Sequence, residues 1–446
     1  MKQSNVVEAT FDQNDELYCS HGPTLKFLRK SDGEEKYFYS CSAYRSRKEC
    51  AFFKWSTDKI SNQYKGRWLD DYRTFKKLGI PHNKRFKLYQ NMLKNGSKAY
   101  KICNTCNIII GHDQNIHIKH VTKPTCTINE TKINDNKSIS TLIPIQQDKK
   151  EAQYHFSQET IKFIEHIINK IGFKKILCVG VPKMFEHLYN VRKKLNISLF
   201  LLDIDPRLTY FWNANHFAHY NFCNNHFFNP KGRVYYENFL MNNCNIKNDD
   251  PLLIIMDPPF GVLIEVLANS LDFIIKNAKK VILTNNYTSM GNDMHILLAN
   301  PYYMKNYISK YMKNLEMLEF KVTYDNHKKN GMNDILKSPI RLFTSIPLSE
   351  ISLTPDLLLN YKICDKCNKM VCRATWHCQI CRTCPINISS TKQYKHCHAP
   401  SCDTCVKPSF VHCAACDKCH PPVSTCCPLK NIDSQKNKKP RLYRIN

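Results

Sequence analysis

Asp257-Pro258-Pro259-Phe260 is the stretch of the chain whose residue types point most directly to chemistry. The five apolar residues before it, 252–256, are typical of a strand that is buried on both faces of a parallel sheet. The two prolines remove backbone donors and fix φ, so they predict that the strand ends there in a stiff turn. Ligands of open α/β sheets bind beyond the carboxyl ends of the strands, where this turn would lie. A rigid turn with a carboxylate and a flat ring is suited to hold a planar group that carries an N–H donor.

The cysteines are the second set of residues with chemical potential: the chain has 23 of them, many spaced as Cys-x2-Cys with histidines nearby. Residues 1–16 are polar and acidic, and no apolar run reaches the ~18 residues of a membrane span. We therefore expect an intracellular protein in a reducing compartment, where such cysteines bind zinc rather than form disulfides.

Residues 17–56 hold three cysteines and a histidine that could form a closed tetrahedral zinc site. The expected ligands are Cys19, His21, Cys41 and Cys50. Aromatic and basic residues alternate around them, which suits stacking of unpaired bases over a groove that neutralises the nucleic-acid backbone. The alternative is a zinc-stapled fold whose aromatics form only its small core. The spacing resembles the GRF-type zinc finger, although Glu35-Lys36 stands where that family has Gly-Arg.

Residues 57–130 form a basic segment with scattered aromatics, for which we expect short helices and a second zinc site of the Cys2His2 type. Its expected ligands are Cys103, Cys106, His117 and His120, with His112 and Cys126 near enough to compete. The gap between the two histidines is shorter than in fingers that read DNA bases, which indicates a structural site. Residues 131–150 are polar and are interpreted as a linker.

Residues 361–427 contain 14 of the 23 cysteines and predict a multi-zinc domain. At four ligands per ion, about three zinc ions would use most of these groups, and the N-terminal sites raise the expected total to about five. Cys-x2-Cys-x2-Cys does not place three sulfurs conveniently on one ion, so we expect neighbouring sites to interleave and leave the pairing open. The expected ligands are Cys364, Cys367, His377, Cys378, Cys381, Cys384, His396, Cys397, Cys402, Cys405, His412, Cys413, Cys416, Cys419 and Cys426. Residues 428–446 are a basic tail that we expect to be disordered.

Residues 151–350 predict the α/β domain that must position the Asp-Pro-Pro-Phe turn. Ser157 is suited to cap a helix, in which isoleucines recur at helical spacing. Strands are expected at 175–180, 198–203, 233–236, 252–256 and 281–284. Their alternation with helical stretches predicts right-handed crossovers and a parallel sheet that is covered on both faces. Two later apolar stretches, 320–324 and 340–346, could form a terminal antiparallel pair.

A doubly wound sheet with an acidic-Pro-Pro-aromatic turn after a central strand resembles the S-adenosylmethionine-dependent amino methyltransferases. The resemblance implies an α/β fold class: a Rossmann-like class I methyltransferase core, flanked here by N-terminal and C-terminal zinc-binding modules. Asp257 and the carbonyl of Pro258 would accept the two N–H groups of an exocyclic amine, and Phe260 would stack on the base. No strong base is needed, because the amine gains acidity only as methyl transfer proceeds. A structural Pro-Pro turn is the alternative, and the position after a buried strand disfavours it.

The S-adenosylmethionine contacts are expected at the ends of the other strands. Gly180 would let the backbone approach the methionine part, although the richer glycine loop usual in these enzymes is missing. Asp203 or Asp205 would hold the ribose hydroxyls, and Asn238 with Phe239, after the strand expected at 233–236, would contact the adenine. The full expected set is Gln153, Tyr154, Phe156, Gly180, Pro182, Asp203, Asp205, Asn238, Phe239 and Asp257. Each residue has an alternative as a loop cap or core residue.

The order of the modules over about residues 17–427 resembles the zinc-finger N6-adenosine methyltransferase family of large-subunit (28S) ribosomal RNA. The resemblance implies S-adenosylmethionine-dependent N6-methylation of adenosine in 28S rRNA, structured ribosomal RNA as the partner, and a location in the nucleus or nucleolus and the cytoplasm. The formal net charge of +27, from 65 Lys and Arg against 38 Asp and Glu, favours such a polyanionic partner. The family's terminal Cys-x2-Cys-x4-His-x4-Cys knuckle is not legible after Cys426-Cys427, and the basic residues 436–444 could replace its RNA contacts.

Two alternatives remain beside this prediction. One is an RNA-binding zinc scaffold with an inactive methyltransferase core, which the sparse glycine loop permits. The other is a methyltransferase of DNA adenine or of a protein amide; Asp257 in place of Asn disfavours the amide, and the module order disfavours DNA. The target nucleotide, the oligomeric state and any ribosome-biogenesis or RNA-helicase partner are left open by the sequence.

Overall fold

A computed structural model of the chain describes most of the α/β region and parts of the flanking segments. The described residues are 6–10, 17–31, 34–43, 47, 50–77, 81–96, 99–103, 108–110, 128–132, 139, 142, 153–241, 251–283, 294–326, 338–385, 394–400, 402, 404–414 and 417–421. The chain forms two compact units, Met1–Ile351 and Ser352–Asn446. The predicted GRF-type module, the basic segment and the α/β core therefore share one unit, and the Cys-rich region lies in the other.

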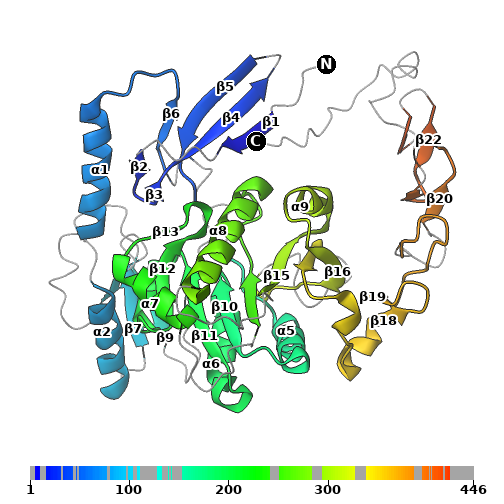
Figure 1. Cartoon of the computed structure of the whole chain (residues 1–446). Coiled ribbons are helices and arrows are strands. Elements are labelled where there is room, and N and C mark those ends of the chain that lie inside the picture. Colours follow the sequence, from blue (N-terminus) through cyan, green and yellow to red (C-terminus); the bar gives the residue numbers. More distant parts are fainter. Residues whose placement is uncertain are drawn as a thin grey trace. The chain divides into compact units, whose positions relative to one another are not determined.

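An eight-stranded sheet is the centre of the first unit, in the order β13-β12-β11-β10-β14-β15-β17-β16 (Figure 1). Its strands are β10 (Lys175–Val179), β11 (Ser198–Asp203), β12 (Phe217–Asn221), β13 (His226–Phe227), β14 (Leu252–Met256), β15 (Met294–Pro301), β16 (Glu316–Lys321) and β17 (Ile340–Thr344). The five strands from β12 to β15 in this order are parallel, and β13, β17 and β16 each pair antiparallel with a neighbour. The strand order reverses between β10 and β14, which is where ligands bind in doubly wound sheets.

Helices cover both faces of this sheet (Figure 1). They are α5 (Gln158–Ile171), α6 (Pro182–Leu195), α7 (Pro230–Met241), α8 (Ile264–Leu283) and α9 (Lys305–Tyr311), with 3-10 turns η1 (Pro206–Tyr210), η2 (Phe222–Asn224), η3 (Tyr302–Met304) and η5 (Leu348–Glu350). α5 and α6 contact each other on one face, while α7 and α8 contact each other on the other. Ser157 caps α5 as predicted, because its side-chain oxygen accepts a hydrogen bond from the backbone N–H of Thr160 at 3.3 Å.

The strands predicted at 175–180, 198–203 and 252–256 are confirmed as β10, β11 and β14, and the terminal antiparallel pair is confirmed as β16 and β17. Only the first two residues of the predicted strand 320–324 lie in β16, which ends at Lys321. The strand predicted at 233–236 is wrong, since these residues lie inside α7. There Val234 is exposed while Tyr236, Phe239 and Leu240 are buried, the spacing of a helix. The strand predicted at 281–284 is also wrong: its first three residues are the last turn of α8, and the fifth parallel strand is β15.

The segments before the core form small sheets and two helices. One sheet has the order β1-β4-β5-β6, and β2 and β3 form a hairpin. The elements are β1 (Val6–Thr10), β2 (Tyr18–Cys19), β3 (Gly22–Pro23), β4 (Leu25–Ser31), β5 (Glu34–Ser40), β6 (Phe53–Trp55), α1 (Asn62–Lys77), α2 (His82–Lys94), β7 (Ala99–Cys103), β8 (Ile108–Ile110) and β9 (Ile128–Lys132). α1 and α2 are the helices expected in the basic segment. Both contact the core, through a hydrogen bond between Tyr72 and His226 and one of 2.6 Å between His82 and the carbonyl of Trp212.

The second unit consists of short hairpins and turns. The elements are η6 (Pro355–Leu359), β18 (Tyr361–Cys364), β19 (Lys369–Cys372), β20 (Lys395–Cys397), β21 (Thr404–Val406), β22 (Val411–Cys413) and β23 (Lys418–His420). They pair as three two-stranded hairpins, β18-β19, β20-β21 and β22-β23. Among the described residues of the whole chain, no helix is both long enough and apolar enough to cross a membrane.

Candidate active site and metal centres

A cavity of about 1110 Å³, counting the part that is open to solvent, lies at the point where the strand order reverses. Its walls come from the residues that end or follow four neighbouring strands, from the segment before α5, and from the N-terminal module. They are Ala43, Gln153, Tyr154, Val179, Gly180, Leu202, Asp203, Ile204, Asp205, Tyr220, Asn221, Phe222, Cys223, Met256, Asp257, Pro258, Pro259 and Phe260. The whole Asp-Pro-Pro-Phe turn therefore lines one side, as its position after a central strand predicts.

Asp257 is held at this wall by Tyr324. The Tyr324 hydroxyl donates a 3.0 Å hydrogen bond to Oδ1 of Asp257, and the backbone N–H of Asp257 lies 3.3 Å from the carbonyl of Val179. Burial raises the pKa of the Asp257 carboxyl well above its ordinary value, and the hydrogen bond from Tyr324 acts in the opposite direction. Burial, together with the nearby Asp257, also raises the pKa of Tyr324 well above its ordinary value. Tyr324 therefore stays protonated near neutral pH and can act as the donor.

Tyr324 reaches Asp257 because two segments that are distant in sequence pair beside the sheet. Phe156, just before α5, forms a β-bridge with Tyr324, and the N–H of Ser157 donates to the carbonyl of Thr323 at 2.9 Å. The Asn326 side chain closes the same pairing with a 2.7 Å hydrogen bond to the carbonyl of Gln153. This pairing fixes both the segment that enters α5 and the segment that leaves β16 against the cavity.

Three aromatic rings lie close to one another at the Asp257 side of the cavity. The rings of Tyr154 and Phe260 lie 6.4 Å apart and are nearly parallel, at 20°, and the ring of Tyr324 lies 5.5 Å from that of Tyr154. A planar base between two rings needs a separation of roughly 7 Å, twice the contact distance of about 3.5 Å between carbon atoms. The space between the rings of Tyr154 and Phe260, which we call the slot, is slightly narrower than this, so one flat heterocycle would fit after a small outward movement of a ring.

Gly180 lies where two turns that line the cavity meet, one after β10 and the other after β14. Its φ is +67°, a conformation that favours glycine, and a Cβ at this position would lie 3.3 Å from the carbonyl oxygen of Asp257. The absence of a side chain therefore allows the turn after β10 to approach the turn after β14. Gly180 permits this close approach although the sequence around it lacks a richer glycine loop.

The two acidic residues after β11 differ in what they bind. Arg207 makes hydrogen bonds of 2.7 and 2.9 Å to Asp205, and although burial opposes it, this pairing holds the pKa of Asp205 below its ordinary value. Asp203 accepts a 2.8 Å hydrogen bond from the backbone N–H of Asp205, and burial, helped by the Asp205 charge, raises the pKa of Asp203 to about 7. Asp205 is thus engaged by Arg207, and Asp203 is the carboxyl suited to accept hydroxyl groups from a ligand.

Six of the expected cofactor residues line the cavity: Gln153, Tyr154, Gly180, Asp203, Asp205 and Asp257. Phe156 and Pro182 line a smaller adjoining cavity that also reaches Asp257. The assignment of Asn238 and Phe239 is wrong, because both lie on α7 and neither lines either cavity. Phe239 is instead a core residue whose ring lies 5.5 Å from that of Phe200.

Ala43, Asn221, Phe222 and Tyr324 are among the lining or supporting residues that were missed. Asn221 and Phe222 follow β12, so they occupy the place that was assigned to Asn238 and Phe239 when the third strand was misplaced. Tyr324 was foreseen only as the end of a terminal strand. Nothing local marks Ala43, which reaches the cavity through the packing of the N-terminal module.

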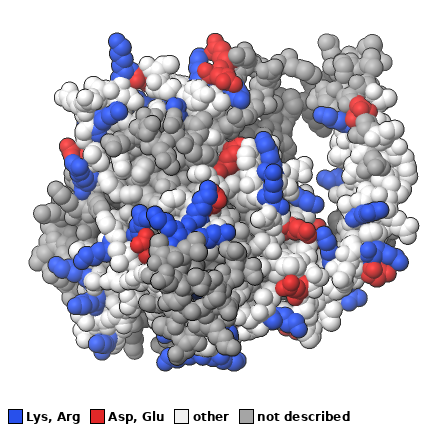
Figure 2. Space-filling view, viewed as in Figure 1, with Lys and Arg blue, Asp and Glu red and all other residues white. Residues whose placement is uncertain are grey.

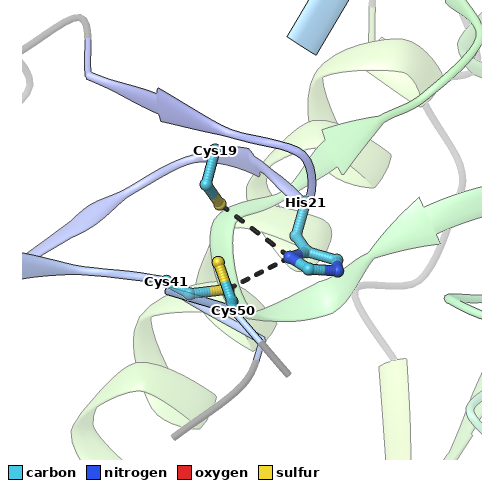
Figure 3. Close-up of side chains that lie close together, drawn as sticks. All are labelled: Cys19, His21, Cys41 and Cys50. Carbon is cyan, nitrogen blue, oxygen red and sulfur yellow. Dashed lines mark hydrogen bonds between the residues drawn. The ribbon is translucent and has the colours of Figure 1, made fainter. Parts of the chain in front are cut away.

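The N-terminal module brings Cys19, His21, Cys41 and Cys50 together (Figure 3). Their ligand atoms all lie within 4.8 Å of one another, with the Nδ1 of His21 3.5 Å from the Sγ of Cys41 and 4.0 Å from the Sγ of Cys19. In a tetrahedral zinc site with bonds of about 2.0–2.3 Å, ligand atoms are roughly 3.4–3.8 Å apart. The donor set and its spacing therefore fit a structural zinc ion.

The aromatic residues of this module are divided between its core and its surface. Phe27 is fully buried and stacks on Phe38 at 5.4 Å, which in turn lies 5.2 Å from Phe53. Tyr37 is exposed, with the ammonium of Lys26 5.3 Å from the centre of its ring. The stacked phenylalanines therefore belong to the core of the module, and the Tyr37 ring lies at its surface.

Three further groups of four ligands occur among the described residues of the second unit. They are Cys364, Cys367, His377 and Cys384; Cys378, Cys381, His396 and Cys405; and Cys397, Cys402, His412 and Cys419. Adjacent residues such as His377 and Cys378 belong to different groups, and so do His396 and Cys397. The sites are therefore interleaved as the Cys-x2-Cys-x2-Cys spacing predicts, and their pairing, which the sequence left open, is now assigned.

The remaining expected ligands are not placed in a group. Cys413 is described and lies outside these three groups, and its expected neighbours Cys416 and Cys426 lie outside the described residues. For the Cys2His2 site, only the backbone of Cys103 is described, at the end of β7, while Cys106, His117 and His120 lie outside the described residues. Both assignments stay predictions.

A tyrosine-rich surface, which we define as Tyr302, Tyr303, Tyr307 and Tyr311, follows β15. Its side chains are 50%, 64%, 56% and 36% exposed. Three exposed lysines, Lys305, Lys310 and Lys313, lie in the same stretch, and the hydroxyl of Tyr311 donates to Glu265 at the start of α8 at 2.8 Å. On the face drawn in Figure 2, Lys and Arg side chains are more abundant than Asp and Glu over the described surface.

Comparison with known proteins agrees with these features. Residues 147–345 match the family model described as probable N6-adenine methyltransferase. The human rRNA N(6)-adenosine-methyltransferase ZCCHC4 is 31% identical over 378 residues, which cover 82% of this chain and 70% of the human protein. The protein of the same name from Xenopus tropicalis is 32% identical over 370 residues, covering 81% of this chain and 72% of its own length.

Proposed function

The chain belongs to the family of ZCCHC4-like rRNA N6-adenosine methyltransferases, and from this premise we propose that it methylates N6 of an adenosine in large-subunit (28S) ribosomal RNA. The activity of the family is rRNA N6-adenosine methylation, and the restriction to 28S rRNA is the finer part of the proposal. One observation carries the catalytic half: Asp257, oriented by Tyr324, stands beside the slot between Tyr154 and Phe260.

The cavity fits S-adenosylmethionine, which supplies an electrophilic methyl group when it is bound. Asp203 would accept the ribose hydroxyls, because Asp205 is already paired with Arg207. Gly180 would lie against the methionine part, since the chain there carries no side chain. Asn221 and Phe222, at the end of β12, would form the adenine side of the pocket.

The acceptor adenine would enter the slot between Tyr154 and Phe260 after leaving the RNA stack. Tyr324 occupies Oδ1 of Asp257, so Oδ2 and the carbonyl of Pro258 can accept the two N6–H groups. These two acceptors turn the nitrogen lone pair away from the wall and into the cavity, where the methyl group arrives. Asp257 would also accept the proton that N6 releases as it gains the methyl group.

The tyrosine-rich surface supports the RNA half of the proposal. Met256 pairs with Leu298 in the sheet, so Asp257 is level with Ala299, three residues before Tyr302. At about 3.3 Å per residue, the surface begins roughly 10 Å further along the strand direction. Exposed rings interleaved with lysines suit single-stranded RNA, whose bases stack on the rings while the lysines neutralise phosphates. We infer that nucleotides beside the target adenosine bind here.

Zinc ions at the four Cys/His groups would stabilise the modules that flank the core. With the predicted Cys2His2 site they would bring the total to the expected five. From the family alone, we also propose that the protein acts where large ribosomal subunits are made and used, in the nucleolus and the cytoplasm; imaging of a tagged full-length protein tests this.

Methylation of 28S rRNA by purified Asp257→Ala protein tests the proposal against the inactive scaffold. We expect wild-type protein to convert one adenosine of unmodified 28S rRNA to N6-methyladenosine, measured by mass spectrometry of RNase fragments. We expect the variant to lose at least ~100-fold in rate, because it loses an acceptor made for the reacting amine. Zinc-replete wild-type protein that binds neither S-adenosylmethionine nor its product in calorimetry would favour the scaffold. Methylation of small-subunit rRNA instead would overturn the 28S assignment while leaving the chemistry intact.

A further inference from the structure

We propose that the zinc module formed by Cys19, His21, Cys41 and Cys50 is a wall of the cofactor pocket, so that zinc binding and S-adenosylmethionine binding strengthen each other. The inference rests on the proposed function, since it takes the cavity as the S-adenosylmethionine site. It assigns to this module a role in cofactor binding, distinct from any contact with RNA.

The loop that carries the zinc ligand Cys41 continues directly into the pocket. Cys41 and the next residue, Ser42, are buried, at 0% and 1% exposed. Ala43 then lines the cavity together with Asn221 and Phe222 at the end of β12. Only two peptide bonds therefore separate a metal ligand from the pocket wall.

Asn221 joins this loop to the sheet. Its side chain is 1% exposed, and its Nδ2 donates one hydrogen bond of 2.9 Å to the carbonyl of His21 and another of 2.9 Å to the hydroxyl of Ser42. Its Oδ1 accepts a 3.1 Å hydrogen bond from the N–H of Cys223, which also lines the cavity. One buried amide thus connects two ligand-bearing segments of the zinc module with the adenine side of the pocket.

The hairpin between β2 and β3 is docked closely against the same region. At Gly22, where φ is +97°, an added Cβ would lie 2.7 Å from the ring of His226. Beside it, Asn224 donates a 2.7 Å hydrogen bond to the carbonyl of Pro23. A displacement of the ligands on this hairpin would therefore be transmitted to the turn that follows β12.

Zinc supplies the rigidity that this arrangement needs. The module is small, and its ligands hold together segments from residue 19 to residue 50, so without zinc the Cys41-Ser42-Ala43 loop loses its fixed position. The pocket would then lose Ala43 from its wall, and Asn221 would lose the partners that orient it. Coupling of this kind is reciprocal, so bound cofactor must also raise the affinity of the module for zinc.

Zinc affinity of the full-length protein tests the linkage directly. A chromogenic chelator of known affinity is titrated with and without saturating S-adenosylhomocysteine until zinc is at equilibrium between chelator and protein. We expect one zinc ion to be bound at least about 5-fold more tightly with the ligand, and we expect this protected ion to be missing from the Cys41→Ser protein. Equal zinc affinities with and without bound ligand overturn the inference. Absence of ligand binding in calorimetry on the same preparation would count against the proposed function instead.

Two variants test whether the pocket wall formed by this loop contributes to cofactor binding, and neither replaces a zinc ligand. Ala43→Phe places a large ring in the pocket, and we expect it to weaken binding of S-adenosylhomocysteine at least ~10-fold with unchanged zinc content. Ser42→Ala removes one partner of Asn221 from behind the wall. We expect it to raise KM for S-adenosylmethionine roughly 2- to 10-fold and to leave kcat unchanged.

Ser345→Ala is the matched control, because it also removes one side-chain hydrogen bond, accepted from the N–H of Ile296 at 3.0 Å, at a residue that belongs to neither the zinc module nor the cavity. We expect it to bind S-adenosylhomocysteine as the wild type does. Wild-type affinity in both Ala43→Phe and Ser42→Ala would overturn the inference. If Ala43→Phe fails to fold, the comparison of Ser42→Ala with Ser345→Ala remains, and equal KM values in these two variants would reject the inference.

Discussion

The hydroxyl of Tyr324 lies 3.0 Å from Oδ1 of Asp257, joining the segment that leaves β16 to the turn that follows β14. Tyr324 is fully buried and Asp257 is partly buried, and burial raises the pKa values of both groups. The hydrogen bond therefore does two things: it fixes the plane of the carboxyl group, and it favours the ionised form of Asp257. Because Tyr324 contacts Oδ1, the proposed mechanism assigns the reacting amine to Oδ2.

Tyr324→Phe keeps the ring and removes this hydrogen bond. We expect kcat to fall roughly 10- to 100-fold, because a hydrogen bond to a charged group contributes about 1.5–3 kcal/mol. Affinity for S-adenosylhomocysteine should change little, since Tyr324 does not line the main cavity. Single-turnover methylation and calorimetry separate the two effects.

The same variant predicts a shift in the pH profile. The hydrogen bond lowers the pKa of Asp257 against the effect of burial, so its loss must raise that pKa further. If the ionised carboxyl accepts the N6–H, the acidic limb of the kcat profile should move to higher pH. Tyr210→Phe is the control, because Tyr210 is equally buried and its hydroxyl accepts a hydrogen bond from the N–H of Ile109, far from Asp257 in the fold. An unshifted profile in Tyr324→Phe would falsify the orienting role.

Asp203→Asn should raise the stability of the protein while it lowers the affinity for ligand. The pKa of Asp203 is raised from 3.8 to about 7, so the fold favours its protonated form. The contribution of this group to stability is fully present below pH 3.8 and is lost as the pH rises through 7, at roughly 1.4 kcal/mol per pH unit within that window. Asn does not titrate and can still accept the N–H of Asp205, so the variant should exceed the wild type in Tm by a margin that grows from pH 5 to about pH 7 and then stays level.

Ligand affinity should move in the opposite direction in this variant. At pH 8 the wild-type Asp203 is ionised and accepts the ribose hydroxyls, so Asp203→Asn should bind S-adenosylhomocysteine about 10-fold more weakly. The affinity of the wild type should decrease below pH 7, while that of the variant stays level. Calorimetry at several pH values measures both. A variant that loses stability at pH 8, or binds as well as the wild type, contradicts the assignment.

Replacing Tyr303 and Tyr307 together tests the tyrosine-rich surface. Both side chains are more than half exposed, so the free energy of unfolding of the double Ala variant should differ from that of the wild type by no more than about 0.5 kcal/mol. Loss of base stacking should raise Kd for single-stranded RNA about 10-fold or more, and the Phe variant should restore it, because stacking needs the ring and not the hydroxyl. Fluorescence anisotropy with a labelled oligonucleotide gives the comparison. Equal affinity of the Ala and Phe variants would exclude stacking at this surface.

Cys405→Ser tests the interleaved metal sites of the second unit. Cys405 shares a group with Cys378, Cys381 and His396, and its Sγ lies 3.4 Å from that of Cys381. We expect metal analysis to show the loss of one zinc ion per chain. Cys372→Ser is the control: Cys372 is buried in β19 and belongs to none of the four groups found among the described residues, so its replacement should leave the zinc content unchanged. Loss of zinc in both variants would mean that the groups are wrongly assigned.

Local patterns were sufficient for the parts of this protein in which a short stretch carries its own physical signal. The apolar run 252–256 followed by two prolines determines a buried strand with a stiff turn, and Ser157 determines where α5 begins. The same patterns failed at 233–236 and 281–284. An apolar or aromatic run of three or four residues also fits one turn of a buried helix, and only packing against the rest of the core distinguishes the two.

The sequence by itself determined the Asp-Pro-Pro-Phe turn, the ligands of the four Cys/His groups and the α/β core, because residue type and spacing suffice for each. Tertiary structure alone decided that Tyr324 reaches Asp257, that Arg207 pairs with Asp205 and not with Asp203, and that Ala43 borders the pocket. These relationships join residues brought together by strand order and burial. Their hydrogen bonds and pKa shifts exist only once water has been excluded between segments that no local pattern connects.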